Sequence, residues 1–394
     1  MTDTALLIID LAAIAVAVAA VGLLPRISRD TVPFGVRVPP ERVGAPEITA
    51  ATRAFGVAVL ATGALAAAAS LLLWPVLPAG AAAGTVGVLL AAGLVACYAR
   101  AHRAVRRAKA QGDWYAGLRQ GVAADTSLRT APLPFPWLGA APSLLVTAAT
   151  AVVGAVLYPG LPDRLVTAVV YRGEDVEYTT AATTPATVFA PVFFQAVAVA
   201  VLLLLLRLTL RARPDADASR PRENADRHRR FLRIWARTVL VSTLLSAVAL
   251  GALALLFWTG SMAEAGPVAA VLVAVPMLLA GLVVLGVAVR IGQGGWRLRA
   301  DARDGAGTGL VQQDDDRFWH LGGFVYINRH APGLLVPKRA GGLGWTVNLG
   351  HPAAWAVLGT VVLMVAVPVA LGLLGVVDLN GSEFYGWKFE PGAE

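Results

Sequence analysis

The residues best suited to bind a metal lie in one stretch, residues 314–355, which holds His320, His330 and His351 behind a run of aspartates. Imidazole and carboxylate groups are zinc ligands, and three protein ligands with one open position make a catalytic zinc site. The histidines are separated by ten and twenty-one residues, and neither spacing matches a tight ligand pair. We therefore expect them to cap turns or contact lipid headgroups, with no bound metal and no other cofactor. The aspartates fit a solvated turn or a helix start: Asp314, Asp315 and Asp316.

A carboxylate also interrupts the first apolar run of the chain. Asp10 lies within residues 5–24, and an ionisable group inside hydrocarbon is a candidate functional residue. It is only about a third of the way into the run, so water or headgroups could reach it. It could also pair with an arginine or a helix N-terminus elsewhere in the bundle. A polar path near Asp10 would suit a transporter, whereas Gln195 needs no role beyond an interhelical hydrogen bond.

No sequence motif for catalysis is present. The chain has no glycine loop followed by Lys-Ser/Thr and no His-Glu-x-x-His. The segment GSMA at 260–263 lacks the pattern of a nucleophile elbow, and no serine has a histidine near it in the sequence. We therefore expect a protein that is not an enzyme.

Composition indicates a membrane protein, because 57% of the 394 residues are apolar and only 15% are charged, against about 25% charged in soluble domains. Crossing the hydrocarbon core takes about 20 apolar residues. Eight runs have about this length: 5–24, 54–74, 79–98, 138–158, 187–206, 238–258, 267–289 and 354–377. The predicted fold is an all-α integral membrane protein with about eight transmembrane helices.

The longest segment that reads as folded in water is 314–355. Short runs rich in aromatic and β-branched residues lie at 324–328, 334–337 and 345–349, with turn-forming sequences between them. These runs predict a small β-containing cytoplasmic insert directly before the last helix. Its candidate functional residues are Trp319, His320, Lys338, Arg339 and Trp345.

Basic residues predict the orientation in the membrane. Of the 33 lysines and arginines, all but Arg164, Arg172 and Lys388 fall in four alternate loops, 25–53, 99–137, 207–237 and 290–353. Cytoplasmic loops carry such an excess, so we expect a multi-pass protein of the plasma (cytoplasmic) membrane with both termini outside. Because topology accounts for the net charge of +8, we expect the partner to be the lipid bilayer, including anionic lipid inside, and not nucleic acid.

The largest outer loop, residues 158–186, contains two β-prone stretches at 165–171 and 176–180, with the turn sequence RGED between them. Its acidic side chains outnumber its basic ones. Such a loop could meet a cationic peptide, or could simply be soluble.

Several segments resemble a known family. The sequence YPGLPD at 158–163 and VFAP at 188–191 resemble the loop and following helix of a bacterial membrane-protein family that includes immunity proteins against the sporulation-delaying peptide toxin of bacilli. The segment VPFGVRVP at 32–39 is similar to eight-helix relatives of that family, and 314–355 resembles a second, uncharacterised domain attached to those relatives. The matching loop residues are Leu161, Pro162, Asp163, Gly173 and Asp175.

The chain departs from this family at one place. The family loop carries Pro-x-His-aromatic-Asn after its Leu-Pro-Asp, whereas residues 166–170 here read VTAVV. The histidine and asparagine of the family are absent here, while the turn-forming Pro162 and Gly173 remain.

The resemblance implies sensing of, or immunity to, a membrane-active peptide, with signalling to a cytoplasmic regulator. A transporter or exporter is the alternative. In the first case the outer loop receives the signal and the insert responds, through a surface that contacts an acidic partner or anionic lipid: Arg317, Arg329, Lys338 and Arg339.

The predicted organisation has five parts. A three-helix segment with cytoplasmic loops (1–137) precedes a helix–outer loop–helix unit (138–210), and an Arg-rich linker with helices six and seven (211–313) follows. The cytoplasmic insert (314–355) and the last helix with its outer tail (356–394) complete the chain.

Topology gives a direct test. In a Cys97→Ala background, single cysteines at Asp175 and Ser382 should react with an impermeant thiol reagent added to intact cells, because both positions are predicted outside. Cysteines at Asp217 and Asp315 should react only after lysis. Labelling of position 315 in intact cells would refute the orientation or the helix count.

Overall fold

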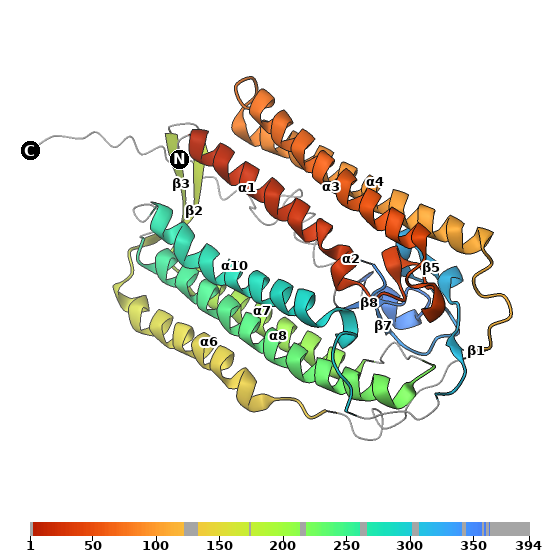
Figure 1. The fold of residues 1–394 in the computed structure, drawn as a ribbon. Helices are drawn as coiled ribbons and strands as arrows, with labels where there is room; N and C mark the ends of the chain where they lie inside the picture. Colours follow the sequence, from red (N-terminus) through yellow and green to blue (C-terminus); the bar gives the residue numbers. More distant parts are fainter. Residues whose placement is uncertain are drawn as a thin grey trace, which may run out of the picture. The chain divides into compact units, whose positions relative to one another are not determined.

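The computed structural model describes residues 3–121, 133–172, 175–212, 218–260, 266–301, 307–340, 344–356, 358, 359 and 362. Within these ranges, six helices are long and apolar enough to cross a membrane (Figure 1). They are α3 (Pro46–Leu73), α4 (Ala79–Gln111), α6 (Trp137–Leu157), α7 (Pro185–Arg211), α8 (Pro221–Trp258) and α10 (Gly266–Ile291). The chain is therefore a largely helical, multi-pass membrane protein.

The two outermost predicted spans stand apart from these six. The first run forms α1 (Asp3–Gly22), whose apolar part, Leu6–Gly22, is shorter than the other spans. The run predicted at 354–377 lies largely outside the described residues. The count of eight thus stays a prediction.

Several helices extend beyond the apolar runs that predicted them. Helix α4 continues from the run 79–98 to Gln111, and α3 begins at Pro46, where proline in the first turn is well accommodated. Helix α8 begins at Pro221, and its polar first turns hold the pairs Glu223–Arg227 and Asp226–Arg230, spaced i,i+4. Hydropathy marks only the part of a helix that lies in hydrocarbon, so the predicted bounds were too short.

The chain divides into two compact units. The first comprises Met1–Leu133, Arg211–Leu232 and Val287–Ala354, and the second comprises Pro134–Leu210, Arg233–Gly286 and Trp355–Glu394.

In the first unit, α1, α3 and α4 pack through small side chains. A Cβ on Gly63 of α3 would lie 2.5 Å from Val18 Cγ2, and one on Gly93 of α4 would lie 2.6 Å from Thr62 Cγ2. Small residues at such positions let membrane helices approach closely. The inward stripe of α4 follows helical spacing and comprises Ala82, Val86, Leu90, Leu94, Tyr98, Ala101 and Val105.

The segment between α2 (Leu24–Ile27) and α3 is a packed element of the first unit. It contains the 3-10 turns η1 (Pro33–Gly35) and η2 (Pro40–Arg42). Phe34 and Gly35 have φ values of 49° and 79°, in the left-handed region that glycine favours. Every residue from 34 to 39 is buried.

Residues 311–347 form short strand pairs. Strand β4 (Val311–Gln312) pairs in parallel with β1 (Gln120–Gly121), β5 (Trp319–His320) is antiparallel to β6 (Val325–Tyr326), and β7 (Leu335–Pro337) is antiparallel to β8 (Trp345–Val347). The connecting turns are η5 (Asp316–Phe318) and η6 (Leu321–Gly323). None of these described strands exceeds three residues, so side-chain bonds must hold much of the segment together.

Asn348 supplies several of those bonds and is completely buried. Its amide donates to the carbonyl oxygens of Asn328 at 2.9 Å and Gly333 at 3.3 Å. Its Oδ1 accepts the backbone N–H groups of Asn328 and Gly350 at 2.9 and 3.0 Å. One side chain therefore ties three turns of the segment to one another.

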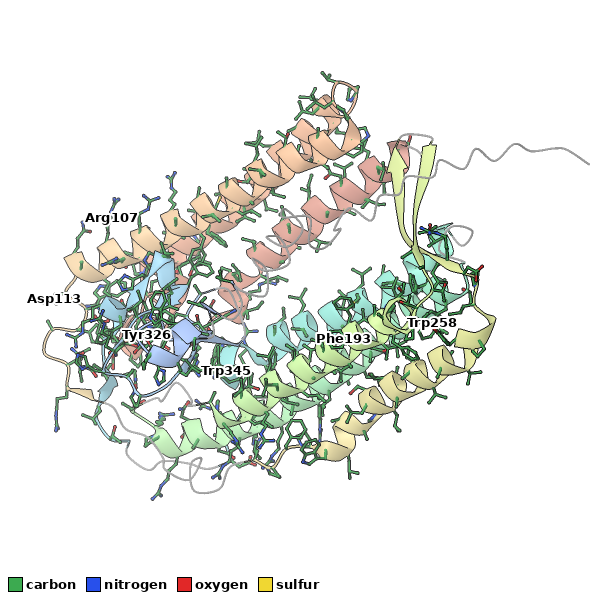
Figure 2. All side chains as sticks on the ribbon, turned by 180° about the vertical axis from the view of Figure 1, so that it is seen from behind. Arg107, Asp113, Phe193, Trp258, Tyr326 and Trp345 are labelled. Atoms are coloured by element: carbon green, nitrogen blue, oxygen red, sulfur yellow. The ribbon has the colours of Figure 1, made fainter. Side chains whose placement is uncertain are left out.

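In the second unit, polar side chains join α6, α7 and α8. The buried Gln195 donates to the Ala247 carbonyl at 2.8 Å and to Thr150 Oγ1 at 3.3 Å, as expected for an interhelical link. Trp258 Nε1 donates to the Val188 carbonyl at 2.9 Å. The large apolar side chains left exposed on these helices, such as Phe193 (Figure 2), are those that lipid would cover.

The loop between α6 and α7 is a β-hairpin, which confirms the two predicted strands. Strand β2 (Arg164–Arg172) is antiparallel to β3 (Asp175–Ala182), with a bulge between Val166 and Ala168. Leu165 anchors the hairpin, being only 2% exposed and packed with Val188 and Trp258. Its turn residues, Gly173 and Glu174, lie outside the described residues.

Candidate functional site

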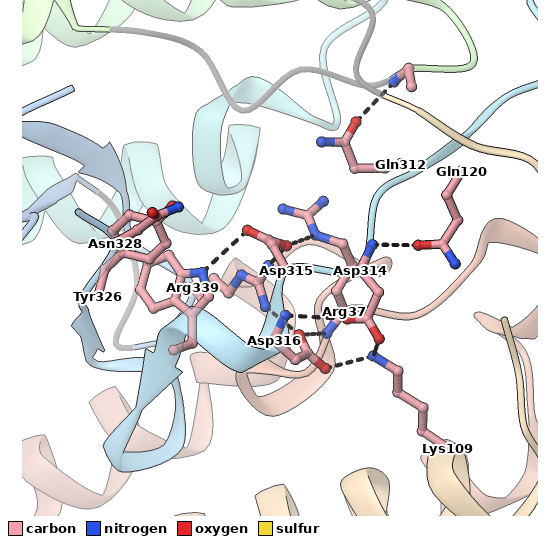
Figure 3. A network of polar contacts seen from close by, with 12 residues as sticks. Arg37, Lys109, Gln120, Gln312, Asp314, Asp315, Asp316, Tyr326, Asn328 and Arg339 are labelled. Carbon is pink, nitrogen blue, oxygen red and sulfur yellow. Dashed lines mark hydrogen bonds and ion pairs between the residues drawn. The ribbon is translucent and has the colours of Figure 1, made fainter. Parts of the chain in front are cut away.

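In the described part of the first unit, a dense set of charges is centred on the consecutive aspartates 314–316 (Figure 3). Their cationic partners come from three segments, namely the loop after α2, the end of α4 and the end of β7. We call this set the aspartate clamp and define it as Arg37, Lys109, Asp314, Asp315, Asp316 and Arg339.

Lys109 binds two of the carboxylates. Its Nζ lies 2.8 Å from Asp314 Oδ2 and 2.6 Å from Asp316 Oδ2, and the side chain is only 11% exposed. The ammonium also lies 4.8 Å from the centre of the Tyr115 ring, which a cation–π attraction favours. The last turns of α4 are thereby fixed to the segment 314–316.

Arg37 binds Asp315, and it also binds Asp316, which Lys109 already contacts. Its Nε donates to Asp315 Oδ1 at 2.8 Å, and its backbone N–H donates to Asp316 Oδ1 at 3.1 Å. The buried loop 34–39 is thus attached to the aspartates through both main chain and side chain.

Arg339 completes the clamp from within the segment of short strand pairs and the turns that follow them, which we call the 311–354 segment. Its two terminal nitrogens donate to Asp315 Oδ1 and Asp316 Oδ1, and its guanidinium lies 5.0 Å from the centre of the Trp319 ring. Trp319 Nε1 donates to the other oxygen of Asp315 at 3.4 Å. With three cations against three carboxylates, the clamp balances its formal charge, as charges removed from water must.

Asp316 is the carboxyl of the clamp most affected by burial. Burial raises its pKa above the ordinary aspartate value, and the nearby Lys109 ammonium opposes that rise. As the pH falls, Asp316 therefore takes up a proton at a higher pH than an ordinary aspartate would. Acidification would then weaken its bonds to Lys109 and Arg339.

Beside the clamp, two glycine turns meet backbone to backbone. A Cβ on Gly35 would lie 2.5 Å from the Gly322 carbonyl oxygen, and one on Gly323 would lie 3.0 Å from Gly35 Cα. Tyr98 of α4 donates its hydroxyl to that Gly322 oxygen at 3.1 Å. All three glycines have positive φ, so both the conformation and the close approach require glycine.

Aromatic rings extend this contact into the helices. The Phe34 ring packs edge-on against Phe55 at 5.1 Å, and Tyr98 packs against Phe324 at 5.3 Å between centroids. Such aromatic pairs add a modest stabilisation beyond that from burying their apolar area. The loop after α2, the helices α3 and α4 and the segment 311–354 thus share one packed contact.

The predicted residues of the insert have different surroundings. Arg339 is only 3% exposed, and its charge is used within the clamp, which differs from the expected surface for an acidic partner. Lys338 and Trp345 are half-buried, with the Trp345 ring 6.2 Å from Phe231. His320 is exposed.

The three histidines of the insert do not share a common set of contacts. His320 and His330 are exposed, and His351 Nδ1 accepts the Ala353 N–H at 3.2 Å, as a turn-capping histidine would. Among the described residues, no group of three His, Cys, Asp or Glu side chains is placed to hold a metal ion.

Asp10 has a partner that the sequence analysis did not consider. Ser70 of α3 is fully buried and donates its hydroxyl to Asp10 Oδ2 at 2.5 Å. The expected partner was an arginine or a helix N-terminus. A short hydroxyl side chain on the neighbouring helix fills that place instead.

The matching residues of the 158–186 loop lie at the base of the hairpin. Leu161 packs against the cluster around Leu165, and Pro162 and Asp163 are exposed, with both of their carbonyl oxygens bound by Thr183. Asp175 begins β3 opposite Arg172. Gly173 lies outside the described residues.

The aspartates 314–316 were predicted as a solvated turn or a helix start. Asp316 does begin the 3-10 turn η5, but the three carboxylates are paired in the clamp and only partly exposed. A run of three carboxylates in a loop where cations dominate was the available signal, but nothing local identified Lys109 or Arg37 as partners.

Comparison with protein families gives a match over a short part of the chain. Residues 331–355 match the model of a family of unknown function (DUF5808). No curated protein and no solved structure matches the chain. The matched residues include Arg339 of the clamp and the buried Asn348.

Removing Arg339 tests the clamp. Arg339→Ala leaves Asp315 and Asp316 partly buried without this cation, so the free energy of unfolding should fall by about 3 kcal/mol, the lower end for a broken buried pair. Lys338→Ala, its neighbour, should change that free energy by less than about 0.5 kcal/mol. Denaturant unfolding of the full chain in detergent measures both.

A double variant measures the interaction free energy between Asp315 and Arg339. Asp315→Ala with Arg339→Ala should cost clearly less than the sum of the two single changes, because the partners no longer leave each other unpaired. Strict additivity would mean that the pair contributes nothing.

Proposed function

We propose that the protein senses, or confers immunity to, a membrane-active peptide and passes the signal to a regulator or to anionic lipid on the cytoplasmic side. In this proposal it is an eight-helix protein of the plasma membrane with both termini outside. Residues 314–355 are then the cytoplasmic insert, and the loop 158–186, which contains the hairpin, is the outer receptor element.

The aspartate clamp is the observation that carries the proposal. It attaches the insert to the loop after α2 and to the end of α4 through ion pairs that are mostly shielded from solvent. Close-packed contacts transmit displacement because they cannot deform continuously. A shift of α4 along its axis would therefore move the insert. If the clamp contact has two discrete arrangements, such a shift would switch the insert from one position to the other.

The hairpin supports the receptor role. Its two strands pair only with each other in the described part of the chain, which leaves an edge on each side. An extended peptide can add as a strand to such an edge. Acidic residues of this loop, such as Asp163, Asp175 and Glu177, would attract a cationic peptide.

The base of the hairpin offers a route into the helices. Leu165 packs with Val188 of α7 and Trp258 of α8, and Trp258 bonds the Val188 carbonyl. A peptide that pulls on β2 would act on these two helices.

Basic residues outside the clamp would form the surface that contacts an intracellular partner. Arg317 and Arg329 are exposed and Lys338 is half-buried. These side chains can contact an acidic protein or anionic lipid headgroups without breaking the clamp.

A transporter or exporter is the alternative, and the Asp10–Ser70 pair is the observation that favours it. A carboxylate bonded between two helices of the bundle is a feature of polar paths in membranes. If that alternative holds, Asp10→Asn should abolish transport. If the sensing proposal holds, the same change should leave the response to the peptide unchanged.

The sensing proposal is tested with two sets of charge variants in a strain lacking the native gene. Arg317→Glu with Arg329→Glu should abolish the response to a cationic peptide while leaving peptide binding intact, because only the inner surface changes. Asp163→Asn, Asp175→Asn and Glu177→Gln should weaken peptide binding, more so at low salt, where exposed charges are least screened.

The control is Arg107→Glu, an exposed basic residue of α4 that is outside both surfaces. It should leave binding and response as in the unchanged protein. Wild-type resistance in both variant sets would contradict the sensing role, and the insert would then only brace the helices.

A further inference from the structure

A cleft of about 240 Å³ lies beside the aspartate clamp in the first unit. Its walls come from the loop after α2, the start of α8, the glycine turn after α10 and β4. A volume below the ~300–1,000 Å³ of pockets for drug-sized ligands suits a small group such as a headgroup.

The cleft is lined mainly by cationic and hydrogen-bonding side chains. Arg29, Arg37 and Arg227 contribute to its wall, against one carboxylate, that of Asp30. Guanidinium groups bind phosphate through paired N–H donors. The lining therefore favours an anion with several acceptor oxygens.

Each of these arginines is already positioned by other groups. Arg29 Nε donates to the Gln293 carbonyl at 3.4 Å, Arg227 binds Glu223 at 3.0 Å, and Arg37 is held by the clamp. Guanidinium groups fixed in this way lose little conformational entropy when a ligand binds.

The glycine turn after α10, η4 (Gln293–Gly295), packs directly on the Arg29 side chain. A Cβ on Gly294, whose φ is +63°, would lie 2.5 Å from a terminal nitrogen of Arg29. Glycine at this position therefore leaves room for the guanidinium at the cleft wall.

The start of α8 adds to the positive potential. Ser219 and Asn224 line the cleft on either side of Pro221, the first residue of this 38-residue helix. Helix N-termini favour anions because their first N–H groups have no partner within the helix. Thr308 fixes this start by donating its hydroxyl to the Ala218 carbonyl at 2.6 Å.

The lining also includes residues that follow two helix ends, one of them the end of the apolar helix α10. Arg29 follows the end of α2 at Ile27, and Trp296 follows the end of α10 at Ile291. Tryptophan and arginine at such positions are characteristic of the headgroup layer. An anionic phospholipid is therefore one source of phosphate to test at this cleft.

We propose that this cleft binds a phosphate group, supplied by an anionic phospholipid headgroup or by free phosphate. Arg29 and Arg227 bind the phosphate oxygens, and the start of α8 adds its partial positive charge. The inference does not depend on peptide sensing, and a lipid bound here would stabilise the contact between the insert and the helices.

Lipid binding is measured on the full chain, purified in a neutral detergent, as the rise in thermal unfolding midpoint on titration with phosphatidylglycerol. Parallel titrations use phosphatidylcholine and inorganic phosphate. Phosphatidylglycerol should stabilise the unchanged protein, and phosphatidylcholine should do so much less. Stabilisation by inorganic phosphate alone would make free phosphate the ligand of the same site.

Three variants locate the site. Arg29→Gln and Arg227→Gln should each weaken the apparent affinity about tenfold or more, since each removes charged donors. Thr31→Phe should weaken it similarly by filling the cleft, although it removes no charge. Arg222→Gln, on the exposed side of α8 and outside the cleft lining, is the matched control and should bind as the unchanged protein does.

Two outcomes would overturn the proposal. One is equal stabilisation of all four variants and the unchanged protein, which means diffuse attraction to a basic surface. The other is no stabilisation of the unchanged protein by either phosphatidylglycerol or phosphate. Variants are compared only where size-exclusion elution is unchanged, and Arg29→Lys, which keeps the charge without the fork of donors, should give an intermediate affinity.

Discussion

The first unit depends on the pairing of three carboxylates with three cations at a place with little access to water. Removing a charge from water costs several kcal/mol, and the cost is recovered only when the partners are close and well oriented. Lys109, Arg37 and Arg339 meet that condition around Asp314–Asp316 because each comes from an element fixed by other contacts. The pairing therefore specifies one docking position for the 311–354 segment.

That docking position explains features that otherwise look unrelated. Gly35, Gly322 and Gly323 allow the backbones to meet, Tyr98 donates a hydrogen bond to the Gly322 oxygen, and Asn348 ties the turns at Asn328, Gly333 and Gly350 together. The same arrangement places Arg37 between the clamp and the arginine-lined cleft. Any ligand in that cleft would act on the docking contact directly.

Much of the helical architecture could be predicted from the sequence because hydrocarbon imposes a length and a composition on each span. The hairpin at 164–182 was also predictable, since its β-prone stretches flank a turn sequence. The helix ends were not, because polar turns such as those of α8 are stabilised by i,i+4 ion pairs that hydropathy ignores.

The clamp could not be predicted for a different reason. Its partners are far apart in the chain, as Lys109 and Asp316 are. An ion pair between distant segments leaves no periodic pattern in the sequence. Lys338 and Arg339 are adjacent cations, yet Lys338 is half-buried and Arg339 is 3% exposed and bound to two aspartates.

Hydrogen–deuterium exchange of the full chain in detergent tests most directly whether the clamp holds the segment 311–354 on the membrane helices. In Asp315→Asn with Asp316→Asn, the account predicts that amides of 32–39 and of 323–349 lose protection together. A loss of about 1.4 kcal/mol in opening free energy would raise their exchange about tenfold, while α7 keeps its protection. Faster exchange confined to the immediate neighbours of positions 315 and 316, with 32–39 unchanged, would contradict it.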